Sequence, residues 1–344
     1  MKAVQLEAVG RLSITTIDRP RLTAPDQILV QTKAVGICGS EVHAFEGTHP
    51  YRTPPCILGH EAAGVVVEVG EQVTRVRVGD RVIVDPQWPC GACIFCRNGD
   101  INLCPHKKVL GTPAWPGAFA EYFVAPEASV FPLPDHFSFV QGALIEPLTV
   151  GVHVARRAGL SPGQSAVILG SGSIGGLLAG VCHARGADPV IVADIRQHCL
   201  DAARERLGAT HDILLPNGRV VDEVRSLTQG EGADVVFVTA DEGELVHQAV
   251  EMAKPRGVIV LVALLTAAPL SLRAYDIIGK ERHLIGSSMS NHQDVEEAIA
   301  LAAEARVDVE GIVTHILPID EAQRGMELAA TKADGAIKVV LTYP

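Results

Sequence analysis

The stretch SAVILGSGSIGGLLAG, residues 165–180, limits the possible fold more than any other part of the chain. An apolar run typical of a buried strand is followed by a G-x-G-x-x-G pattern and then by a helical pattern. In that context the first glycine makes a tight turn, the second lets the backbone approach a pyrophosphate, and the third lets the helix pack on the strand. The sequence therefore predicts a dinucleotide site at the start of the helix. The loop residues expected to bind the cofactor are Gly170, Gly172, Ser173, Ile174 and Gly175.

The next apolar run ends at Asp194, about twenty residues after the loop, the usual distance for a ribose-binding carboxylate. A carboxylate there accepts hydrogen bonds from the adenosine ribose and repels a 2′-phosphate, which favours NAD over NADP. Arg196 weakens that preference because a nearby arginine can accommodate the phosphate. Val262, in the apolar run 258–265, is a further expected cofactor contact. The alternative is a purely structural turn with a solvated aspartate.

The pattern of apolar residues changes near residue 150, and the length of 344 residues favours two domains. Residues 1 to about 150 contain short alternating apolar runs separated by turn signals, which indicates a mainly β domain. From about residue 155, apolar runs alternate with helical patterns, which indicates βαβ units and a parallel sheet. The fold class expected is therefore α/β. A helix follows after about residue 285, and the run AIKVVLTYP closes the chain as a strand.

The net charge of −11 argues against affinity for nucleic acid or an anionic membrane. The first thirty residues show no signal-peptide pattern, and no apolar stretch is long enough to span a bilayer. We therefore expect a cytoplasmic protein. In a reducing compartment, clustered cysteines are more often metal ligands than disulfides.

Four of the eight cysteines occupy one short segment with the spacing C-x2-C-x2-C-x7-C. They are Cys90, Cys93, Cys96 and Cys104. Four thiolates fill the tetrahedral shell of a Zn²⁺ and leave no position for a substrate, so the site is expected to be structural. An iron–sulfur cluster is the rival interpretation, because it also uses four thiolates. Four buried cysteines without a metal are a third, poorer interpretation.

A second set of candidate ligands lies in VGICGSEVH, ILGHEAAG and LIEPLTVGVH. The residues are Cys38, Ser40, His43, His60, Glu61 and Glu146. A catalytic zinc takes about three protein ligands of mixed Cys, His and carboxylate type and keeps one position open. Each residue alone has an ordinary structural explanation, and only their joint presence favours a metal site.

The succession C-G-S-x-x-H, G-H-E, four cysteines, I-E-P-L and G-S-G-S-I-G resembles the zinc-containing medium-chain alcohol dehydrogenases over nearly the whole chain. Within that family it resembles the polyol branch, which includes sorbitol dehydrogenase and the bacterial threonine dehydrogenases. The resemblance implies a GroES-like mainly-β catalytic domain in two segments, with a Rossmann domain inserted between them. The boundaries expected are 1–152 and 286–344 for the catalytic domain and 153–285 for the Rossmann domain.

The resemblance also implies roles for the candidate residues. Cys38 and His60 would bind a catalytic zinc directly, and Glu61 and Glu146 would complete its shell directly or through water. Ser40 and His43 would relay the alcohol proton to solvent. The family carries two zinc ions per chain, uses NAD and forms oligomers, a tetramer or a dimer.

Two positions depart from the family pattern. The polyol branch usually has Asp after C-G-S, where this chain has Glu41, so support of a zinc-bound histidine from that position is an open question. The threonine dehydrogenases usually have an arginine where this chain has Cys199, so no cofactor contact is transferred to it.

The reaction implied is oxidation of a secondary alcohol to a ketone, with a polyol as the first expected substrate. An amino alcohol dehydrogenase of the threonine type, a non-catalytic NAD- or zinc-binding protein and a metal-free quinone reductase are the alternatives. The loop 47–55 could line the substrate entrance, although its His49 and Arg52 are expected to be solvated surface residues. The run VIVLVAL, residues 258–264, is a candidate interface strand near the edge of the Rossmann sheet.

Overall fold

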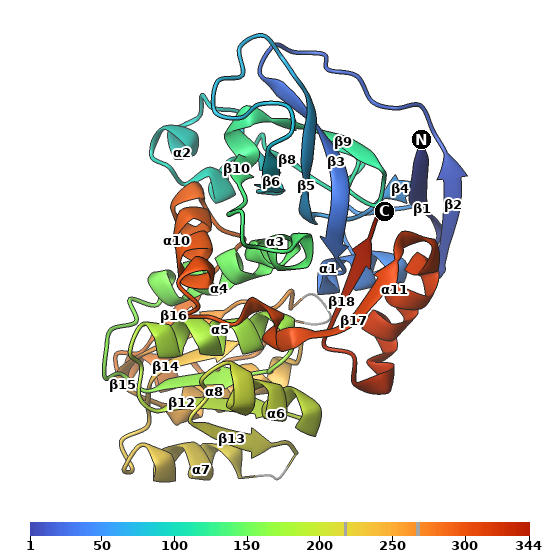
Figure 1. Cartoon of the computed structure of the whole chain (residues 1–344). Helices are drawn as coiled ribbons and strands as arrows, with labels where there is room; N and C mark the ends of the chain where they lie inside the picture. Colours follow the sequence, from blue (N-terminus) through green and yellow to red (C-terminus); the bar gives the residue numbers. More distant parts are fainter. Residues whose placement is uncertain (217–218, 266–268) are drawn as a thin grey trace. The chain divides into compact units, whose positions relative to one another are not determined.

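The computed structural model describes residues 1–216, 219–265 and 269–344, which divide into two units (Figure 1). The first unit comprises Met1–Glu146, Asn291–Ile299 and Val313–Pro344, and the second comprises Pro147–Ser290 and Ala300–Ile312. The sequence assigned 1–152 and 286–344 to the catalytic domain, whereas residues 147–152, 286–290 and 300–312 lie with the second unit.

The first unit is built on a mixed sheet of seven strands. Its order is β10-β6-β5-β3-β18-β17, and β9 also pairs with β3. The strands are β3 (Gln27–Gly36), β5 (Glu61–Val69), β6 (Arg81–Val84), β9 (Tyr122–Pro126), β10 (Val130–Pro132), β17 (Val313–Pro318) and β18 (Lys338–Thr342). Figure 1 shows β3 and β18 side by side although they come from opposite ends of the chain. This pairing brings the C-terminal strand to the residues that follow β3.

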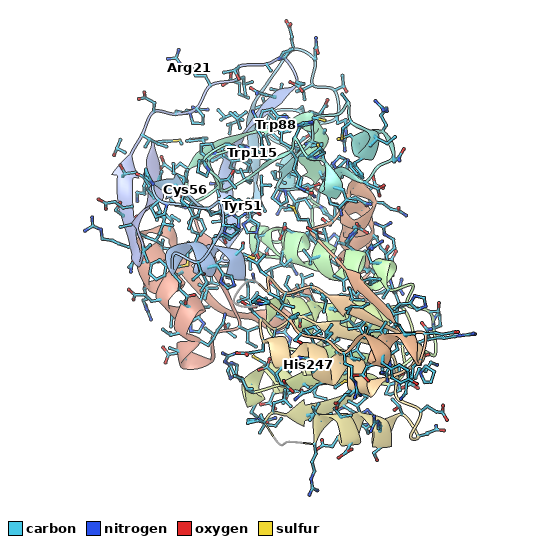
Figure 2. All side chains as sticks on the ribbon, turned by 180° about the vertical axis from the view of Figure 1, so that it is seen from behind. Arg21, Tyr51, Cys56, Trp88, Trp115 and His247 are labelled. Atoms are coloured by element: carbon cyan, nitrogen blue, oxygen red, sulfur yellow. The ribbon has the colours of Figure 1, made fainter. Side chains whose placement is uncertain are left out.

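Smaller elements complete the first unit. A sheet of order β2-β1-β4 contains β1 (Lys2–Ala8), β2 (Arg11–Thr16) and β4 (Cys56–Ile57), and β7 (Gln87–Trp88) pairs with β8 (Lys108–Val109). The helices are α1 (Gly39–Phe45), α2 (Ile94–Arg97), α3 (Phe139–Ala143) and α11 (Ala322–Thr331), and α10 (His292–Ala303) begins here. Short 3₁₀ turns are η1 (Ile101–Leu103), η2 (Glu127–Ser129), η4 (Ile319–Glu321) and η5 (Ala333–Gly335). The chain's two tryptophans, Trp88 and Trp115, lie in this unit with their rings 5.4 Å apart (Figure 2).

The second unit contains a parallel sheet of order β13-β12-β11-β14-β15-β16, which confirms the expected α/β class. Its strands are β11 (Ala166–Leu169), β12 (Val190–Asp194), β13 (His211–Leu214), β14 (Ala233–Val238), β15 (Ala253–Leu261) and β16 (His283–Gly286). Its helices are α4 (Ile145–Arg157, whose first two residues belong to the first unit), α5 (Ser173–Ala184), α6 (Gln197–Arg206), α7 (Val220–Leu227), α8 (Gly243–Met252) and α9 (Ala274–Ile278), with the turn η3 (Val309–Ile312). All four residues of β11 are buried, as expected for a central parallel strand.

The run VIVLVAL was expected near the sheet edge, and its strand, β15, lies next to the edge strand β16. It pairs with β14 on one side and β16 on the other. The hydrogen-bonding groups of β15 are therefore used within the sheet. An apolar run signals burial, and it cannot distinguish a central strand from an edge strand covered by another molecule.

Candidate metal and cofactor sites

Cys38 lies at the start of helix α1, immediately after strand β3. Its backbone is extended, and its N–H donates to Glu41 Oε2 at 2.7 Å. Glu41 is the third residue of the helix, the position from which a glutamate reaches back to the residue preceding the helix. The longer side chain at this departure from the family pattern therefore has a local function in holding Cys38 in place.

Glu41 also holds His60. Its Oε1 lies 2.6 Å from His60 Nδ1 and accepts the N–H of Gly59 at 2.9 Å. Because a carboxylate only accepts, Nδ1 donates its proton to Glu41, which leaves Nε2 as the ring nitrogen that can face a metal. Burial raises the pKa of Glu41, but the attraction and hydrogen bond of His60 outweigh it and lower the pKa to about 2. Glu41 is thus an ionised carboxylate of the kind that orients metal-binding histidines.

Glu61, the first residue of β5, pairs with Lys338 of β18. Lys338 Nζ lies 2.7 and 2.9 Å from the two carboxylate oxygens and 3.1 Å from the carbonyl oxygen of Ile37. Both side chains are fully buried. A Cβ on Gly36 would lie 1.9 Å from Glu61 Oε2, so only glycine leaves room for this carboxylate. The buried ion pair fixes Glu61 beside His60. The charge of the Glu61 carboxylate is therefore already paired with one cation, the ammonium group of Lys338.

The ligand atoms of Cys38, His60 and Glu61 lie within 4.8 Å of one another. Glu146, in the first turn of α4, lies outside this group of three. Burial raises the pKa of Glu146 to about 7, with His60, Glu61 and Lys338 also affecting it. The combination of thiol, imidazole with a fixed tautomer, and carboxylate fits a Zn²⁺ with an open coordination position.

Ser40 and His43 lie on α1, next to Cys38. His43 Nδ1 is 3.1 Å from Thr48 Oγ1. Ser40 Oγ accepts a hydrogen bond from Arg52 Nη1. The expectation that His49 and Arg52 are solvated is wrong: they are 7% and 4% exposed. His49 Nδ1 accepts the backbone N–H of Tyr51 and of Arg52, and this tight turn directs both side chains inward.

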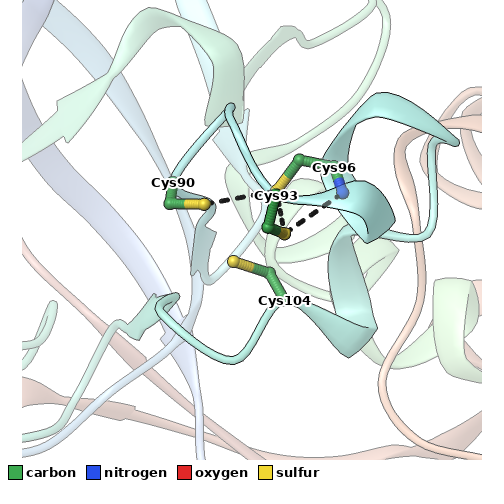
Figure 3. Close-up of side chains that lie close together, drawn as sticks. All are labelled: Cys90, Cys93, Cys96 and Cys104. Atoms are coloured by element: carbon green, nitrogen blue, oxygen red, sulfur yellow. Dashed lines mark hydrogen bonds between the residues drawn. The ribbon is translucent and has the colours of Figure 1, made fainter.

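The four cysteines of residues 90–104 converge on one point (Figure 3). The sulfur of Cys96 lies 3.5 Å from that of Cys93 and 3.9 Å from that of Cys90. Thiolates around one tetrahedral zinc lie about 3.8 Å apart, because each Zn–S bond is about 2.3 Å. In a four-iron cluster the thiolates bind different iron atoms and lie farther apart, so the spacing fits a single ion.

The glycine loop of the second unit has the geometry that the sequence predicts. Gly170 follows β11 and has a φ of 103°, and Gly172 precedes helix α5. A Cβ on Gly175 would lie 1.8 Å from the carbonyl oxygen of Gly170, whereas a Cβ on Gly172 would meet nothing within 4 Å. Gly175 is therefore required for packing, and Gly172 leaves open space beside the helix N-terminus. Ser173 and Ile174 are partly exposed in the first turn of α5.

Asp194 is the last residue of β12 and is 7% exposed. Its Oδ2 accepts the N–H of Ser171 at 2.7 Å, which ties the strand end to the glycine loop. The guanidinium of Arg196 lies 4.0 Å from Oδ1. Cys199, 3% exposed, accepts a bond from Ser171 Oγ through its carbonyl oxygen. Val262 follows β15 and donates its N–H to Val238.

Sequence reasoning missed two residues of the first unit. Lys338 is a lysine in the otherwise apolar run AIKVVLTYP, and a lone cation in a buried strand indicates a buried carboxylate partner. Arg52 had no comparable signal, because its loop contains polar residues and prolines typical of an exposed connection.

Comparison with known proteins agrees with this geometry. Residues 24–135 match the family described as alcohol dehydrogenase GroES-like domain, and residues 173–304 match the family described as zinc-binding dehydrogenase. The sorbitol dehydrogenase of Bacillus subtilis is 33% identical over 100% of this chain and 97% of its own. Sorbitol dehydrogenase 2 of Saccharomyces cerevisiae is 34% identical over 99% of this chain and 98% of its own. A crystal structure of an alcohol dehydrogenase from Escherichia coli CFT073 complexed with NADH is 30% identical, covers 100% of this chain and 99% of its own, and has a TM-score of 0.91.

The chain therefore belongs to the zinc-dependent medium-chain dehydrogenase family, with a GroES-like domain and a Rossmann-like zinc-binding dehydrogenase domain. No helix in the described residues is long and apolar enough to cross a membrane.

Proposed function

We propose that the protein oxidises a secondary alcohol group of a polyol with NAD. The observation that carries the proposal is the group of Cys38, His60 and Glu61, a mixed donor set beside a candidate proton relay. The similarity to two sorbitol dehydrogenases supports a polyol as the substrate. In the reaction the alcohol loses a hydride to NAD⁺ and a proton to solvent, which gives a ketone and NADH.

Cys38 and His60 would hold the catalytic zinc, and Glu61 and Glu146 would supply carboxylates beside it. Zinc in such a site lowers the pKa of a hydroxyl group, and the nicotinamide accepts the hydride. Glu41 keeps the His60 ring in the tautomer that exposes Nε2. Ser40 and His43 would transfer the proton in the manner of general acid–base catalysis. The four cysteines of residues 90–104 would hold a second, structural zinc.

In the second unit, Gly170, Gly172 and the first turn of α5 would bind the pyrophosphate of NAD. The carboxylate of Asp194 would accept hydrogen bonds from the adenosine ribose. Val262 would contact the cofactor at the end of β15. Asp194 favours NAD, since a carboxylate repels the 2′-phosphate of NADP.

The direct test is NADH formation with sorbitol, xylitol, galactitol and threonine, measured side by side with NAD and with NADP. We expect turnover with at least one of the three polyols and preference for NAD. Turnover with threonine alone would replace the polyol assignment by an amino alcohol dehydrogenase. An NAD-binding protein that oxidises none of the four would favour a non-catalytic role.

Cys38→Ala tests the metal assignment. We expect it to abolish turnover and to remove one of two zinc ions per chain, measured by elemental analysis. Cys182→Ala, at a buried position in α5 of the second unit, is the matched control and should keep both ions and activity. Equal zinc content in the two variants would contradict the assignment.

Two coarser proposals complete this assignment. We propose a cytoplasmic location, supported by the thiols of residues 90–104, which stay available for a metal in a reducing compartment. We also propose a homo-oligomer, a tetramer or a dimer, which sedimentation analysis of the zinc-loaded protein would determine.

A further inference from the structure

Arg52 is a buried cation without an ion-pair partner. Its side chain is 4% exposed, and among the described residues it forms no salt bridge with a carboxylate. Its Nε is buried without a hydrogen-bond partner. Burying a guanidinium in this way is costly, since neither water nor a nearby anion compensates it fully. Such a cost needs an explanation beyond filling space in a loop.

The contacts of the guanidinium suggest where it acts. Nη1 donates to Ser40 Oγ, and Nη2 donates to the carbonyl oxygen of Leu110 at 3.3 Å. A serine hydroxyl has one donor hydrogen and two acceptor lone pairs. Arg52 occupies one lone pair of Ser40, which leaves the hydrogen and one lone pair for a relay. That is the minimum a relay needs, because it must accept one proton and donate another.

We infer that Arg52 is a positioning residue for proton transfer, which fixes the Ser40 hydroxyl in the orientation that a relay requires. This inference rests on the proposed function, because it assigns a role within the same site. The bond from Nη1 restricts the rotation of the hydroxyl about Cβ–Oγ. The buried position gives the cation more effect on Ser40 than an exposed arginine has, because water screens it less.

Two other roles for Arg52 predict different kinetics. An arginine that only ties the loop 47–55 to Leu110 would affect stability and zinc content, and it would act independently of Ser40. An arginine that binds an anionic group of the substrate would mainly affect KM. A positioning residue for Ser40 instead affects kcat, and only when Ser40 is present.

The experiment is a double-mutant cycle on the zinc-loaded enzyme with Arg52→Gln, Ser40→Ala and the double variant. Arg11→Gln, at an exposed ion pair on β2 of the same unit, is the control. We expect Arg52→Gln to lower kcat by about 10- to 100-fold with little change in KM, as for loss of general acid–base assistance. In the Ser40→Ala background the same substitution should change kcat less than about twofold, since the residues act as a unit.

Equal effects of Arg52→Gln in both backgrounds would overturn the inference, and so would a change confined to KM. If Arg52→Gln is insoluble or loses zinc, Arg52→Lys is used in the same cycle. Lysine keeps the charge but lacks the planar fork, so we expect a smaller loss of kcat that again disappears without Ser40. A wild-type enzyme that oxidises no alcohol would refute the proposed function itself, and this outcome is distinct from an active enzyme that is insensitive to Arg52.

Discussion

Asp85 is a single buried side chain that should make the free energy of unfolding depend on pH. It follows strand β6 and is 3% exposed. Its Oδ1 accepts the backbone N–H of Gln87 at 3.1 Å, and its Oδ2 lies 3.6 Å from His292 Nε2. Burial raises the pKa of Asp85 to about 7, the hydrogen bonds from Gln87 lower it in part, and the nearby carboxylate of Asp294 raises it. The folded protein therefore holds a proton that the unfolded chain releases near pH 4.

A raised pKa of Asp85 in the folded state stabilises the protein at low pH, and this stabilisation is lost as the pH rises through about 7. Asp85→Asn removes the titration. We expect the free energy of unfolding of the wild type, minus that of the variant, to fall by on the order of 2 kcal/mol between pH 5 and pH 8. Urea unfolding of both proteins with zinc present measures it. A difference that is constant with pH would show that Asp85 titrates normally.

At the scale of residues, the sequence predicted ligand types better than their supporting contacts. The Cys, His and Glu residues of the metal group stand in recognisable short motifs, so they could be identified one by one. Their partners could not. Glu41 supports His60 through a long-range hydrogen bond, and Lys338 reaches Glu61 across 277 positions of the chain. Short-range patterns carry no information about such contacts, and the burial of Arg52 was missed for the same reason.

At the scale of elements, the sequence predicted one segment most completely. This segment consists of strand β11, the glycine loop and helix α5. Its glycines have separate functions because their surroundings differ. Gly175 faces the carbonyl oxygen of Gly170, while Gly172 faces open space. Elements defined by local periodicity and turn chemistry are predictable in this way, whereas the place of β15 in the sheet depends on its pairing with two other strands.

Alanine substitutions at the two glycines should therefore affect different quantities: one should weaken NADH binding and the other should lower stability. Gly172→Ala should fold with an unchanged Tm but weaken NADH binding by at least about tenfold, or about 1.4 kcal/mol, because the methyl group occupies space beside the pyrophosphate. Gly175→Ala should lower the free energy of unfolding by about 2 kcal/mol or more, through collision with Gly170. NADH fluorescence titration and thermal unfolding measure the two effects. Tight NADH binding by Gly172→Ala would exclude it from the cofactor site.

At the scale of the whole molecule, the two units differ in the interactions that stabilise each of them internally. The second unit has a parallel sheet whose central strands are buried. The first unit has a lobe at residues 90–104 with little apolar burial: Ile94, Phe95 and Leu103 are exposed, and only Ile101 among its large apolar side chains is buried. Such a segment has too little hydrophobic core of its own to order it, so we predict that its order depends on a metal ion bound by the four cysteines.

Cys104→Ser tests this dependence, because it removes the buried thiol of the set. We expect loss of one zinc per chain and a drop of on the order of 10 °C in the unfolding temperature of the first unit, since structural zinc contributes several kcal/mol to folding. Trp88 and Trp115 both lie in that unit and are the chain's only tryptophans, so intrinsic fluorescence reports it selectively. Cys182→Ser, in the second unit, is the control and should leave the tryptophan transition unchanged.

NADH binding by Cys104→Ser at 25 °C should persist, because the glycine loop and Asp194 belong to the second unit. If Cys104→Ser instead abolishes NADH binding, or if Cys182→Ser lowers the tryptophan transition equally, then the units do not unfold separately and the zinc stabilises the chain as a whole.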